Sequence, residues 1–304
     1  MGTPSAARTA TRVTTSVSFC LVVLKTIVGL ATGSVAVIAS AVDSALDFLV
    51  SLFNMFAVRG SKKPRDDNHN YGHVKIEGLA ALLEGLFILG SALFVLWKSV
   101  DKLLHPRVIE QSGVDLALAA MVVSMAASAV LVWFLKRMSK RTRSLVLEAD
   151  ALHYRTDVWS NGAVLAGMLV LRFTGWQAAD ALIAGGIGIY IAAAAVPLIR
   201  KGLDMLLDHA LPESVTAEIA HIAATHSPLV NGVHEIRTRR SGEINFVDFH
   251  LVLDEEIPLG IAHRVADEIE ARIRALDDVR WSINIHLDPV DDSHKDRKRE
   301  AGMG

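Results

Sequence analysis

The sequence predicts a bundle of six membrane-spanning helices followed by a small two-layer α/β domain. Of the 304 residues, 51% are hydrophobic and only 21% are charged. The mean hydropathy of +0.36 is higher than a soluble domain of this length normally has. Residues 1–203 contain long uncharged runs, whereas residues 204–304 have the composition of an ordinary soluble sequence. The chain therefore has two parts, and the first of them lies in a membrane.

Six segments of the first part are long enough to cross a bilayer, which needs roughly 20 mostly apolar residues. They lie at about residues 12–32, 35–58, 77–100, 113–135, 145–171 and 178–199. The first segment contains Lys25 and continues almost directly into the second, so we expect a retained span and not a cleaved signal peptide. The single cysteine, Cys20, excludes an intrachain disulfide.

Basic residues in the loops predict the orientation of these spans. Two loops are rich in them, with Arg59, Lys62, Lys63, Arg65 and Lys75 between spans two and three, and Lys136, Arg137, Lys140, Arg141 and Arg143 between spans four and five. The alternate loops are poor in Lys and Arg. The positive-inside rule then places both termini in the cytoplasm, which requires an even number of spans.

The second part alternates between helical and strand patterns. An amphipathic run begins at Pro212, two alternating stretches flank a hairpin turn at Ser241 and Gly242, a second helix covers 258–276, and WSINIHLDP forms a third strand. The order helix, strand, strand, helix, strand predicts a two-layer domain with helices on one face of the sheet. We therefore expect a six-span domain at residues 1–207, a cytoplasmic domain at 208–290 and a disordered tail at 291–304.

Four candidate metal ligands lie inside two of the apolar segments. Asp43 and Asp47 are four residues apart in span two, and His153 and Asp157 are four residues apart in span five. This spacing places each pair on one helical face. A carboxylate at the centre of a bilayer costs at least about 2.5–3.5 kcal/mol, so such residues indicate function. Three carboxylates and one imidazole predict a tetrahedral metal site, which we call the membrane group.

The imidazole favours zinc, ferrous iron, cobalt or cadmium over manganese, magnesium or calcium, which prefer oxygen ligands. A buried ion-pair network or a proton relay without metal is the alternative. No Arg or Lys is expected at a matching depth to neutralise the three carboxylates, which favours the cation site. Lys25 in span one and Glu84 in span three are further intramembrane charges, and each either lines a water-filled cavity or extends to the membrane surface.

Two more clusters of metal-type ligands lie outside the spans. The loop group consists of Asp66, His69 and His73, three and four residues apart, and its alternative is a solvated loop without function. The domain group is dispersed over the predicted strands and second helix of the soluble domain. Its members are His234, His250, His263, His286 and Asp288. Isolated histidines are often ordinary surface or core residues, but five candidates near element ends favour metal binding, with a carboxylate able to bridge two ions.

From about Val13 to Pro289 the chain resembles the cation diffusion facilitator family, and in particular its bacterial zinc and ferrous-iron efflux members. The motifs that carry the resemblance occur in the same order as in the family. They are DSALD, DDNHNYGHVKIEGLAAL, EADALHYRTDVWSNGA, LLDHALPE, GVHEIRTRRSG, DFHLVLD, AHRVADEIE and INIHLDP.

The resemblance implies a ferredoxin-like cytoplasmic domain, a homodimer and exchange of metal for protons. It further implies that the membrane group is the transport site, that the loop group is a second metal site, and that the domain group is a binuclear site at the dimer interface. It also suggests an interlocking salt bridge between Lys75 and Asp208 near the dimer junction.

We therefore expect a proton-coupled antiporter, and not an enzyme, that exports Zn²⁺, with Fe²⁺, Cd²⁺ and Co²⁺ as further candidates, across the bacterial inner membrane. Its expected partners are a second copy of the chain, the lipid bilayer, divalent metal ions and protons, and no nucleic acid. A membrane metallohydrolase is the first alternative, but the sequence has no HExxH motif and no separate general base. The second alternative is a metal sensor with the spans as anchors, which leaves the buried carboxylates unexplained.

Overall fold

The computed structural model describes residues 4–32, 35–105, 114–174, 176 and 178–289. The predicted disordered tail, 291–304, lies outside these residues. The chain divides into two units, Met1–Leu206 and Leu207–Gly304, each with its own packed interior.

The first unit consists of six helices of 27 to 30 residues, which confirms the predicted helical bundle. They are α1 (Pro4–Thr32), α2 (Val35–Ser61), α3 (Lys75–Leu104), α4 (Val114–Thr142), α5 (Leu145–Thr174) and α6 (Ala178–Leu206). Among the described residues, five of them are long and apolar enough to cross a membrane. The sixth, α5, has the length of a span at 30 residues but a more polar composition, because it carries several ionisable residues.

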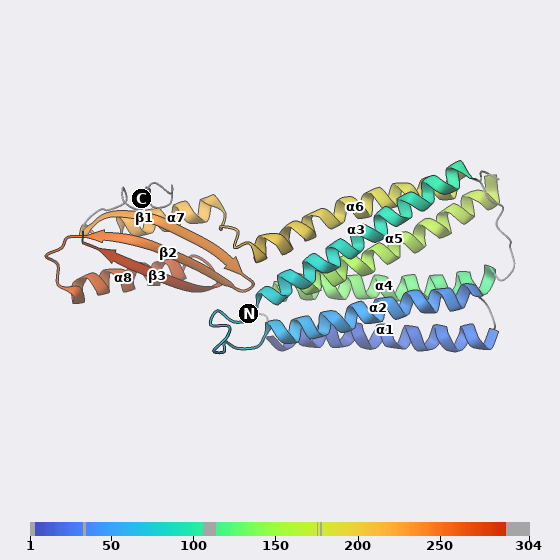
Figure 1. Cartoon of the computed structure of the whole chain (residues 1–304), viewed down its shortest axis with the longest axis horizontal. Helices are drawn as coiled ribbons and strands as arrows, with labels where there is room; N and C mark the ends of the chain where they lie inside the picture. The colour runs from blue at the N-terminus through green and yellow to red at the C-terminus, as the bar shows by residue number, and fades with distance from the viewer. Residues whose placement is uncertain (1–3, 33–34, 106–113, 175, 177, 290–304) are drawn as a thin grey trace. The chain divides into compact units, whose positions relative to one another are not determined.

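The six helices pack mainly as neighbours α1 with α2, α4 with α5, and α3 with α6 (Figure 1). Small residues allow α3 and α6 to approach closely. A Cβ on Gly202 of α6 would lie 2.9 Å from the backbone oxygen of Gly78 on α3. The chain passes from α2 to α3 and from α4 to α5 at one end of the bundle, and the basic loops of the sequence lie there. We call it the basic end.

The second unit contains α7 (Glu213–Thr225), β1 (Val230–Ser241), β2 (Ile244–Leu253), α8 (Leu259–Arg274) and β3 (Arg280–Asp288). This order matches the sequence prediction. The strand order is β1-β2-β3, with β2 antiparallel to β1 and parallel to β3. The predicted hairpin turn joins β1 to β2, and its Gly242 has a φ of 58°, a left-handed conformation that glycine adopts without strain.

The core of the second unit lies between the helices and one face of the sheet. Val247, Phe249 and Leu251 of β2 are buried, as are Ile219 of α7 and Ile269 of α8, and all five belong to one apolar cluster. Successive side chains of a strand point to opposite faces. The even-numbered positions near the centre of β2, including His250, therefore face away from this core.

Candidate metal centres

Three of the four residues of the membrane group come together between α2 and α5. Asp47, His153 and Asp157 each offer a ligand atom, and these atoms lie within 4.8 Å of one another. The Nε2 of His153 is 3.2 Å from the Oδ1 of Asp47. The Oδ2 of Asp157 is buried and finds no hydrogen-bond partner in the described part of the chain. An imidazole and two carboxylates thus converge, with one acceptor oxygen left over.

The fourth residue, Asp43, is one helical turn before Asp47 and lines the same cavity without joining the close group. The cavity has a volume of about 360 Å³, and all six helices contribute to its wall. Its lining residues lie from the middle of the bundle toward the end opposite the basic end. Much of the remaining wall is hydroxyl-bearing, with Ser18, Ser40, Ser44, Ser91, Ser124, Ser128, Thr156 and Ser160. Such a wall suits a hydrated ion.

Lys25 of α1 lines this cavity as well, so the interpretation that no Lys lies at the depth of the carboxylates is wrong. Its Nζ donates a hydrogen bond of 2.7 Å to the Oγ of Ser44. The sequence held a signal for this placement. Lys25 is seven positions before the end of α1 and Asp43 is eight positions after the start of α2, so a short connection puts both at similar depth.

Toward the basic end the cavity is closed by buried polar layers. The hydroxyl of Tyr154 forms hydrogen bonds with the hydroxyls of Ser18 and Ser51, the second at 2.8 Å. Glu84 of α3 lies closer to the basic end. It is only 5% exposed and accepts a 3.1 Å hydrogen bond from Asn54. Glu84 therefore neither lines the cavity nor extends to the membrane surface, in contrast to both readings of the sequence.

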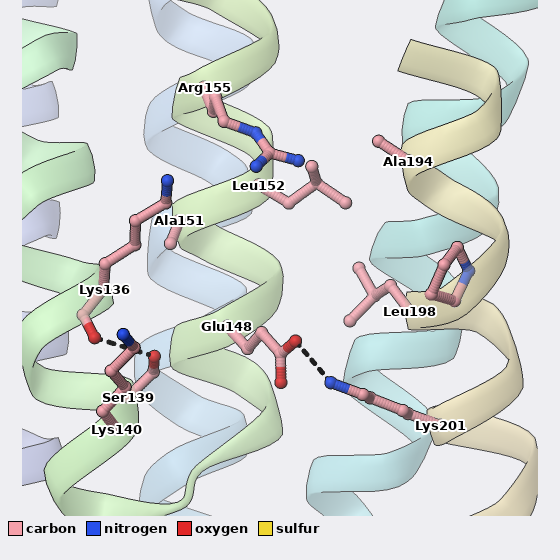
Figure 2. Close-up of a pocket in the computed structure, with 11 residues that line it drawn as sticks. Lys136, Ser139, Lys140, Glu148, Ala151, Leu152, Arg155, Ala194, Leu198 and Lys201 are labelled. Atoms are coloured by element: carbon pink, nitrogen blue, oxygen red, sulfur yellow. Dashed lines mark hydrogen bonds and ion pairs between the residues drawn. The ribbon is translucent and has the colours of Figure 1, made fainter. Parts of the chain in front are cut away.

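A second pocket, of about 670 Å³, lies near the basic end between α4, α5 and α6 (Figure 2). Its ionisable lining consists of Lys136, Lys140, Arg155, Lys201 and Glu148. Lys201 and Glu148 pair at 2.7 Å across the gap between α6 and α5 (Figure 2). The remaining cationic charges make this pocket unfavourable for a metal ion.

The loop group is brought together between α2 and α3. The Nδ1 of His69 is 3.1 Å from the Oδ1 of Asp66, and the Nε2 of His73 is 3.3 Å from the Oδ2. Desolvation would raise the pKa of Asp66, but hydrogen bonds from the side chain and backbone of His69 and the charges of both histidines lower that pKa below its ordinary value. The three ligand atoms could chelate one ion.

In the domain group, sheet register aligns three histidines. His234 on β1 is opposite His250 on β2, and His250 is opposite His286 on β3. They lie on the face away from the core, around Asp288. The Oδ2 of Asp288 is 2.8 Å from His250 and 3.2 Å from His234, and its Oδ1 is 3.2 Å from His286. A carboxylate with both oxygens directed at imidazoles can bridge two ions.

His263 is not part of this arrangement in the single chain. It lies on α8, its side chain is 72% exposed, and it contacts Asp267 at 3.6 Å. The structure adds Glu235, which sequence reasoning missed, with its carboxylate 3.7 Å from His250. Glu235 has a φ of 49° at an irregularity in the pairing of β1 with β2. Glu235 directly follows His234 in the sequence, which could have marked it as a candidate ligand. Its carboxylate reaches the histidines because of the irregularity in β1, which the sequence did not predict.

The predicted salt bridge between Lys75 and Asp208 stays a prediction. Lys75 donates a 3.2 Å hydrogen bond to the carbonyl oxygen of Leu206. Asp208 pairs with Arg239 at 3.1 Å. Both residues thus have other interactions within their own units.

Two family models together match almost the whole chain. The cation efflux transmembrane domain matches residues 11–207, and the cation efflux protein cytoplasmic domain matches residues 211–290. The cation-efflux pump FieF of Escherichia fergusonii is 41% identical over 259 residues, which are 85% of each chain. FieF of Salmonella paratyphi A gives the same values.

Among solved structures, the zinc form of a putative zinc transporter, CzrB, matches 28% of this chain and 96% of its own, at 28% identity and a TM-score of 0.25. The matching families contain transporters and not enzymes, which confirms the expectation that the chain is no hydrolase. The chain belongs to the cation efflux family, also called the cation diffusion facilitators, and is a membrane-spanning efflux transporter of divalent metal cations.

Proposed function

We propose that the chain exports Zn²⁺ from the cytoplasm in exchange for protons, as a homodimer in the bacterial inner membrane with both termini cytoplasmic. Fe²⁺, Cd²⁺ and Co²⁺ are further candidate substrates. The observation that carries the proposal is the convergence of Asp47, His153 and Asp157 inside a cavity built by all six helices. One nitrogen and two carboxylate ligands, with Asp43 one turn away, match the preference of these ions for mixed nitrogen and oxygen shells.

Proton coupling follows from the ligand chemistry. His153 can bind a metal only through an unprotonated ring nitrogen, and a bound divalent cation disfavours protons on Asp47 and Asp157. Metal and protons therefore compete for the same atoms. If the membrane group is reached alternately from the two membrane faces, each transport cycle exchanges a metal ion for protons.

The basic loops support the proposed orientation. The positive-inside rule assigns the basic end of the bundle to the cytoplasm. The cavity of the membrane group extends toward the opposite end, whereas buried layers around Tyr154 and Glu84 close the cytoplasmic side. This arrangement supports an outward-facing state in which the metal leaves the cell. Lys25 beside the carboxylates would then help to displace the departing cation.

The exposed face of the soluble sheet supports a regulatory role in the dimer. Asp288 and the aligned histidines could hold ions there, and a partner subunit seated on that face would complete the ligand set. Such ions would favour one dimer arrangement over another only by their differential affinity for the two. Cytosolic metal would thereby set the rate of export.

Zinc flux into proteoliposomes, with Asp157→Asn compared with Ser160→Ala, tests this function. Both residues line the cavity on α5, but only Asp157 belongs to the close group. We expect flux to fall at least about 100-fold in the first variant and to stay within about twofold in the second, since even outer partners of a metal site contribute 10–100-fold. Normal zinc flux through Asp157→Asn would refute the assignment.

Competition by other ions would define the substrate. Cd²⁺, Fe²⁺ and Co²⁺ should inhibit zinc flux, and Mg²⁺ and Ca²⁺ should not, because the latter two prefer shells of oxygen alone. Measured at two pH values, the competition would also reveal how protons shift the apparent affinity.

A further inference from the structure

A second group of buried acceptor atoms lies between the membrane group and the basic end. Asn54 of α2, Glu84 of α3 and Asp150 of α5 are 0%, 5% and 0% exposed. The Nδ2 of Asn54 donates to both carboxylates, at 3.1 Å to the Oε2 of Glu84 and 3.3 Å to the Oδ1 of Asp150. One amide group therefore holds two carboxylates from different helices together. We call these three residues the inner triad.

The inner triad has more acceptors than donors. The Oδ1 of Asn54, the Oε1 of Glu84 and the Oδ2 of Asp150 are buried and have no hydrogen-bond partner in the described part of the chain. Thr14 of α1 lies near Asp150, but its hydroxyl donates a 3.0 Å hydrogen bond to the carbonyl oxygen of Thr11. Neutral donors do not neutralise two carboxylates in a membrane interior, and a buried charge without a counter-charge costs several kcal/mol.

Glu77, seven residues before Glu84 on α3, shows how a structural carboxylate is accommodated in this bundle. It is 2% exposed, accepts hydrogen bonds from Ser61 at 3.0 Å and Ser144 at 2.8 Å, and lies 3.5 Å from the ammonium of Lys62. Both its oxygens are satisfied and its charge is paired. In the described part of the chain no Lys or Arg forms an ion pair with the inner triad, so its carboxylates lack the structural partner that Lys62 gives to Glu77.

The position of the inner triad relative to the membrane group suggests a route. Asn54 is seven residues after Asp47 on α2, and Asp150 is seven residues before Asp157 on α5, so each lies two helical turns away on a similar face. Both displacements are toward the basic end. In the opposite direction, away from the basic end, the nearest ionisable groups on these two helices are Asp47 and His153 of the membrane group.

We propose that the inner triad is a second cation site, at which the divalent metal ion rests on its way from the cytoplasm to the membrane group. Two carboxylate oxygens and the amide oxygen of Asn54, after a turn of the amide, supply three oxygen ligands. A shell of oxygen alone binds transition metals less selectively than one with an imidazole. The ion therefore passes from a less selective site to a more selective one.

This inference rests on the proposed export function, and the test separates the two. Bound Cd²⁺ is counted by equilibrium dialysis of the full-length chain carrying Asp47→Asn and Asp157→Asn, with and without Glu84→Gln and Asp150→Asn. The loop and domain groups are identical in the two proteins, so their contributions cancel. We expect one Cd²⁺ fewer per chain when the inner triad is neutralised.

Flux supplies the second arm of the test. Glu84→Gln or Asp150→Asn alone should slow zinc flux at least about tenfold, a loss typical of removing a group that supports a metal site. Glu148→Gln, on the same helix but facing the basic pocket, is the matched control and should transport at the normal rate. An unchanged Cd²⁺ count, or normal flux in Glu84→Gln and Asp150→Asn, overturns the proposal. Absence of flux in the unmodified chain would instead refute the export function, and the count would still decide the site.

Asn54→Asp keeps the test decisive if the neutralised protein does not fold. The substitution preserves side-chain volume and adds a third carboxylate, so a cation site should bind Cd²⁺ about tenfold more tightly. A triad with only a structural role would be destabilised by the added charge and would gain no affinity, which would overturn the proposal.

Discussion

The membrane group and the domain group use the same ligand types but leave different atoms without partners. In the bundle, His153 contacts Asp47 at 3.2 Å, and the atom left over is a carboxylate oxygen of Asp157. In the sheet, both oxygens of Asp288 face imidazoles, and the atoms without a hydrogen bond are the ring nitrogens of His234. The first group has an unpartnered carboxylate oxygen, and the second has unpartnered imidazole nitrogens.

This difference separates a site that must exchange its ion from a site that can retain one. A buried carboxylate without a partner is stabilised either by a metal or by a proton, so the membrane group is suited to alternate between them. In the domain group, Asp288 already accepts a 2.8 Å hydrogen bond from His250 and lies 3.2 Å from both His234 and His286, so its carboxylate is partnered without an ion. We therefore expect substitutions in the bundle to affect flux most and substitutions in the sheet to affect stability and metal retention.

The largest expected effect comes from removing the imidazole of each group in turn. His153→Ala should reduce zinc flux at least about 100-fold, because it deletes the only nitrogen ligand of the described membrane group. His250→Ala should leave zinc flux within about tenfold of the rate of the unmodified chain. Initial rates in proteoliposomes of equal protein content measure both, and equal losses in the two variants would remove the distinction between the groups.

Asp288→Asn should act on the soluble domain. The substitution removes the charge of the carboxylate that accepts a 2.8 Å hydrogen bond from His250, and a hydrogen bond to a charged group contributes about 1.5–3 kcal/mol. Faster amide hydrogen exchange in β2 and β3, followed by mass spectrometry in the full-length chain, would report the loss. His263→Ala is the control, since its side chain is 72% exposed, and it should leave exchange unchanged. Unchanged exchange in Asp288→Asn would show that this carboxylate does not hold the three strands together.

Lys25→Met should shift the balance of the membrane group toward metal. The ammonium of Lys25 lines the cavity with Asp43 and Asp47, and its removal takes away a competing cation. Binding of Cd²⁺ should tighten about tenfold, the effect of roughly 1.4 kcal/mol, and turnover should slow because release becomes harder. The dissociation constant for Cd²⁺ and the turnover number for zinc, each measured in the unmodified chain and in Lys25→Met, test both parts of this prediction. Weaker binding in Lys25→Met would show that the lysine supports the metal instead.

The smallest effect concerns the loop group. The pKa of Asp66 is lowered, so its contacts with His69 and His73 are fully present above the ordinary carboxyl pKa and are lost as the pH falls through the lowered value. Amide exchange of residues 66–73, corrected for intrinsic rates, should therefore rise only in strongly acidic solution. Asp66→Asn should show no such rise, because it cannot titrate.

Helical and strand periodicity accounts for much of what could be predicted. The placement of His153 and Asp157 on one helical face was readable because four residues make about one helical turn, and the pairing of His234 with His250 required only a hairpin. Long-range placement was less accessible. Lys25 came to the membrane group through the packing of α1 against α2, and Glu235 through a bulge in β1. Glu84 was visible as a charge, but its hydrogen-bond partner Asn54, which also donates to Asp150, lies on another helix, α2.

Simultaneous measurement of metal and proton movement tests the central claim most directly. Zinc is added to one side of proteoliposomes that contain a metal indicator and a pH indicator, for the unmodified chain and for Asp47→Asn. Exchange at one buried group predicts that zinc entry is accompanied by proton exit in the unmodified chain, and that both signals disappear together in Asp47→Asn. Zinc entry without proton movement, or normal entry through Asp47→Asn, would contradict the account.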